Sequence, residues 1–298
     1  MSVQPSLPPH HPAVVAGLRA AGCVFAEEEA DILLSTARTP DELAAMVERR
    51  VEGLPLEHVV GWAEFCGLRI TLEPGVFVPR RRTEFLARQA AALAPAGAVA
   101  LDLCCGSGAV AAALATHAGL AELHAADLDP AAVRCALRNV SPFGGEVHEG
   151  DLYGPLPAAL RGRVDILAAN GPYVPTGDVA LLPPEARDHE RRMALDGGAD
   201  GLDIMRRVAA GAPQWLAPGG HLFVETSEQQ AAEAVAAVTR SGLAARVVRY
   251  DYFSASVVWG PRGVGGGVGL AAGGGGARGY TPCPSGPPGS GPGAFVSR

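Results

Sequence analysis

With 298 residues, 48% of them hydrophobic, the chain can form one large domain and a small one. Its formal net charge of −7 argues against broad contact with nucleic acid. No apolar run reaches the ~18 residues of a membrane span, and the first residues do not have the pattern of a signal sequence, so we expect a cytoplasmic protein. No Cys-x-x-Cys pair occurs among the six cysteines, so we expect neither a metal site nor a disulfide framework.

The first 54 residues predict a disordered start followed by a small helical domain. We expect residues 1–12 to be disordered and 13–54 to be helical, with short helices over 12–21 and 27–37. Thr39-Pro-Asp-Glu42 is typical of a helix start, because Thr can cap the first turn, Pro fits it and Glu follows three residues on. This domain either packs only against the rest of the chain or holds a macromolecular substrate.

Residues 55–94 depart from helical periodicity and predict a hairpin and a connecting segment. We expect two strands, over 65–72 and 75–79, joined through Glu73-Pro74. Arg80-Arg-Arg82 follows directly. Such a run is either a solvated charge cluster or a contact for an acidic partner.

The stretch 98–108 combines a buried strand with a glycine turn. Its apolar start predicts a strand buried on both faces, and Gly106 and Gly108 then lead into a helix over 109–116. Glycines at such a turn let a ligand approach the backbone and the N–H groups of the helix start. Asp102 would repel a pyrophosphate but suits an ammonium group, so we predict a site for S-adenosylmethionine, with Cys104 among its contacts.

From residue 98 strands and helices alternate, which predicts a doubly wound α/β sheet with Rossmann-like topology over 95–260. Seven strands are expected, over 98–103, 122–127, 147–149, 164–169, 220–225, 246–250 and 255–259. Ligands of such sheets bind at the carboxyl ends of the strands. The Gly/Pro-rich segment 261–298 is predicted to be a disordered tail.

Two carboxylates follow the next two strands. Asp127 lies about twenty residues beyond the glycines, where it can accept hydrogen bonds from ribose hydroxyls. Asp151 follows the third strand, where it can accept from the amino group of adenine; a turn-forming Asp is an equally good interpretation. We include the neighbouring Leu128 and Leu152 among the predicted cofactor contacts.

The fourth strand ends in Asn170-Gly171-Pro172-Tyr173. The Asn side chain and a backbone carbonyl provide two acceptors, which match the two N–H groups of an amide or an exocyclic amine. The Tyr ring can cover a planar substrate. We therefore assign these four residues to catalysis and substrate binding, with Asn170 also touching the cofactor; a plain Gly-Pro loop is the alternative.

Between about residues 55 and 260 the chain resembles the HemK-type protein-(glutamine-N(5)) methyltransferases, which modify the Gln of the Gly-Gly-Gln motif in peptide-chain release factors. The resemblance rests on Pro55-Leu-Glu-His-Val-Val-Gly61, Glu64-Phe-Cys-Gly-Leu68, Gly75-Val-Phe-Val-Pro-Arg80, Thr83-Glu84, the Asp102 loop, Ala126-Asp-Leu-Asp-Pro130, Gly150-Asp151, Glu190, Ala194-Leu195, Gly198-Ala-Asp-Gly-Leu-Asp203 and Pro218-Gly-Gly220. It implies S-adenosylmethionine as cofactor, a release factor as partner and Glu190 as a substrate-binding residue. We expect a monomer without a stable nucleic-acid complex.

Several features depart from the family pattern. Gly171 replaces the first proline of Asn-Pro-Pro-Tyr, Arg81 and Arg82 replace a proline and an acidic residue, and Glu225-Thr-Ser227 replaces Glu-x-Gly. The family also lacks the Gly/Pro-rich tail beyond Gly260. The alternatives are an inactive relative that binds the cofactor, or an enzyme that methylates another protein or a nucleic-acid amine. An adenine-N6 DNA methyltransferase would need a basic groove, and a nicotinamide oxidoreductase would not need Asp102 or the stretch 170–173.

Overall fold

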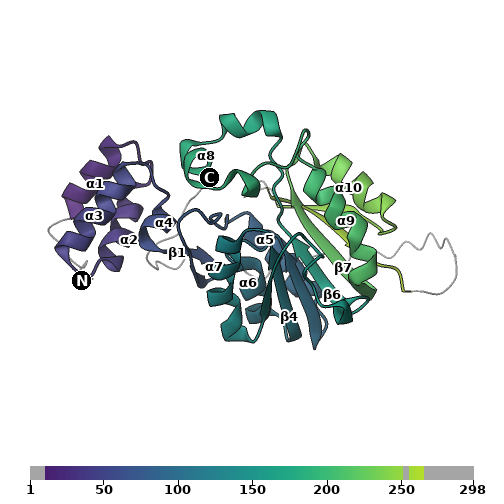
Figure 1. Cartoon of the computed structure of the whole chain (residues 1–298). Helices are drawn as coiled ribbons and strands as arrows, with labels where there is room; N and C mark the ends of the chain where they lie inside the picture. The colour runs from purple at the N-terminus through teal and green to yellow at the C-terminus, as the bar shows by residue number, and fades with distance from the viewer. Residues whose placement is uncertain (1–10, 251–254, 265–298) are drawn as a thin grey trace, which may run out of the picture.

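The computed structural model describes residues 11–250 and 255–264, which form a helical N-terminal part beside an α/β domain (Figure 1). Residues 1–10 and 265–298 fall outside this description, and most of the two segments predicted to be disordered lies there. Within the described part, no helix has both the length and the apolar character that a membrane span needs.

Three helices and a short fourth one build the N-terminal part. They are α1 (His11–Ala20), α2 (Ala26–Thr36), α3 (Pro40–Val51) and α4 (Leu56–Val60). Their apolar side chains form a core of their own. The Thr39 hydroxyl accepts from the backbone N–H of Glu42 at 3.1 Å, so the predicted helix start is confirmed.

The hairpin that follows corrects a prediction. Strands β1 (Trp62–Phe65) and β2 (Leu68–Thr71) pair antiparallel, whereas residues 75–79 form no strand. The turn is Cys66-Gly67, with φ values of 52° and 76°, and two-residue hairpin turns of this kind need two positive φ angles. The turn could not be predicted from the sequence, because cysteine rarely adopts a positive φ. Val76 and Val78 are buried against helix α7 (Pro130–Val140) instead.

A seven-stranded sheet in the order β5-β4-β3-β6-β7-β9-β8 forms the second part. The strands are β3 (Ala98–Leu103), β4 (Leu120–Asp127), β5 (Glu146–Glu149), β6 (Val164–Ala169), β7 (Leu216–Thr226), β8 (Arg246–Tyr250) and β9 (Ala255–Pro261). All neighbours are parallel except β9, which runs antiparallel to β7 and β8. The predicted doubly wound fold is confirmed. The strand order reverses between β3 and β6, and ligands of such sheets bind at that point.

Helices cover both faces of the sheet (Figure 1). One face carries α5 (Thr83–Leu93), α6 (Ala109–His117) and α7 (Pro130–Val140), and the other carries α9 (Asp203–Trp215) and α10 (Ala231–Arg240). Strand β3 is buried along its whole length, which explains why all its residues except Asp102 are apolar. The shorter helices are η1 (Ser141–Phe143), η2 (Ala158–Leu160), η3 (Thr176–Leu181), α8 (Pro184–His189) and η4 (Arg192–Ala194).

The last strand of the sheet, β9, extends beyond the predicted boundary at residue 260. Strand β9 pairs with β7 as far as Pro261. The backbone N–H of Arg262 then donates to the Gly220 carbonyl at 2.8 Å, and that of Gly219 donates to the Arg262 carbonyl at 3.0 Å. Residue 262 is therefore part of the domain, not of the tail.

Candidate active site

A cavity of about 750 Å³ opens at the carboxyl ends of β3 and β6, and its size is typical of small-molecule sites. It is lined by most of the residues that the sequence predicted, namely Asp102, Cys104, Gly106, Asp127, Leu128, Asp151, Leu152, Asn170, Gly171, Pro172 and Tyr173. Gly108 and Glu190 do not line it. The cavity continues to residues 22–25 of the N-terminal part and to 182–186, so it offers room beyond the cofactor loop.

Asp102 contributes a buried carboxyl group to the lining of this cavity. It is 1% exposed and accepts a hydrogen bond of 3.0 Å from the backbone N–H of Ala111 in α6. Burial, with a smaller contribution from the charge of Asp127, raises the pKa of Asp102 from 3.8 to about 8. A buried carboxyl of this kind gains most from a cation beside it, and the ammonium group of S-adenosylmethionine fits that need.

The pKa of Asp102 predicts pH-dependent cofactor binding. The folded chain keeps this carboxyl protonated below about pH 8, whereas pairing with an ammonium group favours the ionised form. Binding at pH 6 must therefore release a proton, and the affinity is expected to rise by up to about tenfold per pH unit between pH 6 and 7.5. Calorimetry in buffers of different ionisation enthalpy measures this release.

The variant Asp102→Asn is the control for this prediction. It cannot ionise, so its affinity should be weaker and nearly independent of pH over the same range. An unaltered chain whose affinity is flat and whose binding releases no proton would place the cofactor ammonium away from Asp102.

The glycine turn positions the start of helix α6. Cys104, Gly106 and Gly108 have φ values of 56°, 54° and 77°, all in the left-handed region. A Cβ on Gly108 would lie 2.8 Å from Val140 Cγ2, so this glycine is needed for close packing on α7. Gly106 has open space at that position, which leaves its backbone accessible from the cavity.

Asp127 is oriented by two backbone donors. Its Oδ2 accepts from the N–H of Gly106 at 2.8 Å, and its Oδ1 accepts from the N–H of Asp129 at 2.9 Å. Burial raises the pKa of the Asp127 carboxyl. Each oxygen keeps a free acceptor position, as hydrogen bonds from two ribose hydroxyls require. Leu128 beside it is 54% exposed and lines the cavity.

Asp127→Ala is expected to weaken S-adenosylmethionine binding by roughly 1–3 kcal/mol, the free energy of losing a charged hydrogen-bond partner. Isothermal titration calorimetry measures it. Asp165→Ala is the matched control, because Asp165 also accepts from a backbone N–H, that of Val99 at the opposite end of β3. Equal affinities in the two variants would refute the role of Asp127.

Asp151 lies at the rim of the cavity and forms an ion pair. Its Oδ2 is 2.5 Å from Nη2 of Arg207 on α9, and both side chains are half exposed. Leu152 next to it is buried and has a φ of 49°. Any contact of Asp151 with adenine therefore has to share this carboxylate with Arg207.

Asn170 follows β6 directly, and its amide is fixed by helix α5. Its Nδ2 donates to the Thr83 hydroxyl at 3.1 Å, which leaves Oδ1 as the free acceptor. Strands β6 and β3 are in register, with Ala169 opposite Leu103, so Asn170 and Cys104 leave the sheet side by side. Thr83 belongs to the Thr83-Glu84 motif, but its contact with Asn170 was not predicted.

Gly171 is packed too closely for a larger residue without adjustment. A Cβ at this position would lie 3.0 Å from Ile204 Cγ2 and 3.4 Å from Cys104 Sγ. Its φ is not in the left-handed region, so the backbone itself does not require glycine. The family proline would therefore need a shift of the Ile204 side chain.

The Tyr173 ring is held by Arg82 and Glu225. Arg82 Nη2 donates to the Tyr173 hydroxyl, Arg82 Nε donates to Glu225 Oε1 at 3.2 Å, and the Tyr173 hydroxyl lies 3.3 Å from the same oxygen. Burial and the Glu225 charge raise the pKa of Tyr173, so it is protonated at neutral pH. Arg82 departs from the family pattern, and its pairing with Glu225, which offsets its charge, could not be predicted from the sequence.

The backbone around Tyr173 is tied to two other segments. Gln230 Nε2 donates to the carbonyls of Tyr173 and Asp200, at 2.8 Å each. Gly201 packs so closely on this loop that a Cβ would lie 2.2 Å from the Tyr173 carbonyl oxygen. These contacts fix the loop that carries residues 170–173.

Glu190 is buried in an ion pair with Arg80 and does not line the cavity. Its two carboxylate oxygens lie 2.8 and 2.7 Å from Arg80 Nη2, and Oε1 also accepts from the backbone N–H of Val78 at 3.0 Å. The side chain is 1% exposed. In this arrangement Glu190 joins the segment after α8 to residues 78–80.

Comparison with known proteins places these features in a family. Residues 67–181 match the family model "Methyltransferase small domain". The release factor glutamine methyltransferase of Geobacter sulfurreducens is 41% identical over 208 residues, 68% of this chain and 72% of that protein. The enzyme of the same name from Mycolicibacterium smegmatis is also 41% identical over 208 residues, 68% and 73% of the two chains.

Two further matches broaden this picture. The 4-amino-L-phenylalanine/4-methylamino-L-phenylalanine methyltransferase of Streptomyces pristinaespiralis is 36% identical over 232 residues, 76% of this chain and 78% of that protein. The crystal structure of a methyltransferase from Pyrococcus furiosus has a TM-score of 0.52 at 15% identity, covering 66% of this chain and 90% of that one. The structural match supports the fold.

Proposed function

The chain belongs to the family of release factor glutamine methyltransferases, and on that premise we propose that it methylates the side-chain amide nitrogen of a glutamine in a peptide-chain release factor. The glutamine of the Gly-Gly-Gln motif is the proposed target. The observation that carries this proposal is the placement of Asn170, oriented by Thr83 and adjacent to the cofactor loop at the carboxyl ends of β6 and β3.

An amide nitrogen is a weak nucleophile, because its lone pair is delocalised into the carbonyl. Asn170 Oδ1 and the Gly171 carbonyl accept its two N–H groups, which orients the nitrogen and stabilises the positive charge that develops on it. S-adenosylmethionine supplies the methyl group, which moves in line from its sulfur to the nitrogen. Positioning of this kind can lower a barrier by ~7–11 kcal/mol at best. The proton leaves after the transfer, so the reaction needs no general base. Tyr173 stays protonated, and its ring would contact the substrate.

The residues that line the cavity would hold the cofactor as follows. Asp102 would pair with its ammonium group, Asp127 would accept from its ribose hydroxyls, and residues 151–152 would contact the adenine. Leu128 would add an apolar contact. Glu190, predicted to bind substrate, would instead position residues 78–80, because its buried carboxyl is bound to Arg80 and to the backbone N–H of Val78. Acting on a translation factor, the enzyme would work in the cytoplasm.

Arg82 favours a second candidate, an aromatic amine that carries a free carboxylate. Its guanidinium lines the cavity beside Tyr173 and could bind that carboxylate. The relative from Streptomyces pristinaespiralis is named for a substrate of this kind. Against it, Glu225 already offsets the Arg82 charge at 3.2 Å.

Methyl-labelled S-adenosylmethionine distinguishes the two candidates. The chain is incubated with an intact release factor or with 4-amino-L-phenylalanine, and the label in each is measured. We expect label in the release factor and none in a factor whose Gly-Gly-Gln glutamine is replaced by glutamate. Label in the small amine alone would replace the first candidate by the second.

A further inference from the structure

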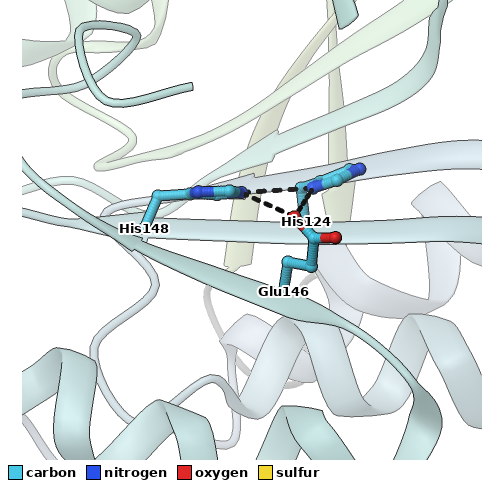
Figure 2. A group of neighbouring side chains, drawn as sticks. All are labelled: His124, Glu146 and His148. Carbon is cyan, nitrogen blue, oxygen red and sulfur yellow. Dashed lines mark hydrogen bonds and ion pairs between the residues drawn. The ribbon is translucent and has the colours of Figure 1, made fainter. Parts of the chain in front are cut away.

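A cluster of two histidines and a carboxylate lies on the sheet, among residues that do not line the active-site cavity. His124 comes from β4, and Glu146 and His148 come from the edge strand β5 (Figure 2). Glu146 is opposite His124 in the strand register, and His148 is two residues further on, so all three side chains leave the same face of the sheet. They come from two strands, which is why sequence spacing gave no sign of them.

The three facing atoms have the spacing of metal ligands. His124 Nδ1 is 3.2 Å from His148 Nε2, and each of these nitrogens is 3.8 Å from Glu146 Oε2. Two nitrogens bound to one tetrahedral zinc ion lie about 3.3–3.4 Å apart. The Glu146 side chain is 64% exposed, so a small rotation brings its oxygen into range. A fourth position remains for water.

A second observation concerns the other nitrogen of His124. Its Nε2 is buried and has no hydrogen-bond partner, and the nearest carboxylate oxygen, Glu122 Oε2, is 3.7 Å away. An ion on Nδ1 requires the proton on Nε2, which then points a donor at Glu122. Metal-bound histidines commonly have such a carboxylate behind them. Arg163, 2.5 Å from Glu122 Oε1, holds that carboxylate in place.

We propose that His124, Glu146 and His148 bind one divalent transition-metal ion of the zinc class, with Glu122 orienting His124. Two imidazoles and one carboxylate suit Zn²⁺, Co²⁺ or Ni²⁺, whereas Mg²⁺ and Ca²⁺ prefer oxygen ligands alone. The ion ties the edge strand β5 to β4. Strand β5 leads directly to Asp151 at the cavity rim, so the ion also steadies that rim.

The test uses the full chain, without a histidine tag and stripped with a chelator. Cobalt is added first and followed by visible absorption, and Zn²⁺ is then titrated by calorimetry. We expect one Co²⁺ per chain with a spectrum of nitrogen and oxygen ligands, displacement by Zn²⁺, and a higher unfolding temperature with the ion. Intense near-ultraviolet bands would instead assign the ion to cysteine thiolates.

Three variants and one control locate the site. His148→Gln and the exposed Glu146→Gln should each weaken Zn²⁺ binding at least about tenfold, and Glu122→Gln by about 10- to 100-fold. His221→Gln removes another partly buried histidine, on β7, and should leave binding unchanged. Unaltered binding in a His148→Gln/Glu146→Gln double variant, or no Co²⁺ binding by the unaltered chain, would show that the two histidines merely share a hydrogen bond.

Discussion

Replacing Asn170 by alanine is expected to lower the rate of methyl transfer by about 10²–10³-fold, while the affinity for S-adenosylmethionine stays close to that of the unaltered chain. The side chain supplies one of two acceptors for the substrate amide, so its loss removes orientation and charge stabilisation together. By analogy with single oxyanion-hole donors, the loss is worth ~3–4 kcal/mol. Single-turnover kinetics measure the rate, and calorimetry measures the affinity.

Thr83→Val provides a graded control for this prediction. It removes the hydroxyl that accepts from Asn170 Nδ2 but leaves the Asn170 acceptor in place. Its rate should therefore lie between those of the unaltered chain and Asn170→Ala. Turnover by Asn170→Ala within a few-fold of the unaltered chain would remove Asn170 from the mechanism.

Replacing Arg80 by alanine is expected to lower the free energy of unfolding by about 3–5 kcal/mol. The change leaves the Glu190 carboxyl buried, with the backbone N–H of Val78 as its remaining donor. Burial already raises the pKa of Glu190, and Arg80 opposes that shift. Without Arg80 the carboxyl must bind a proton or draw in water. Urea unfolding followed by tryptophan fluorescence measures the change.

Arg138→Ala is the control at a more exposed ion pair. Arg138 Nη2 lies 2.9 Å from Glu73 Oε1, and the two side chains are 61% and 23% exposed. Such a pair contributes at most about 1 kcal/mol. Equal losses in the two variants would mean that the burial of Glu190 adds nothing to the stability.

Much of the fold follows from local patterns in the sequence. The central strands of the sheet are predictable because β3 and β6 are almost entirely buried, and each is apolar except for one aspartate. The hairpin is not, since its turn depends on a positive φ at Cys66 that the residue type does not suggest. The prediction of a strand over 75–79 was wrong, because alternating burial also arises in an extended loop that packs on a helix.

In the candidate site, too, some features could be predicted from the sequence and others could not. The common location of Asp102, Asp127 and Asn170 could be predicted, because each lies at the carboxyl end of a strand and the fold brings those ends to one edge. Their partners could not, since Thr83 lies 87 positions from Asn170, and Arg82 lies 143 positions from Glu225. Glu190 illustrates the same limit, because only the folded chain shows that it is paired with Arg80, 110 positions away.

Methylation of a release factor by this chain is tested most directly by mass spectrometry of an intact bacterial release factor after incubation with the chain and S-adenosylmethionine. We expect one added methyl group, mapped by fragmentation to the side chain of the Gly-Gly-Gln glutamine and absent when Asn170→Ala is used. An unmodified glutamine, in the presence of a chain that binds S-adenosylmethionine tightly, would contradict it.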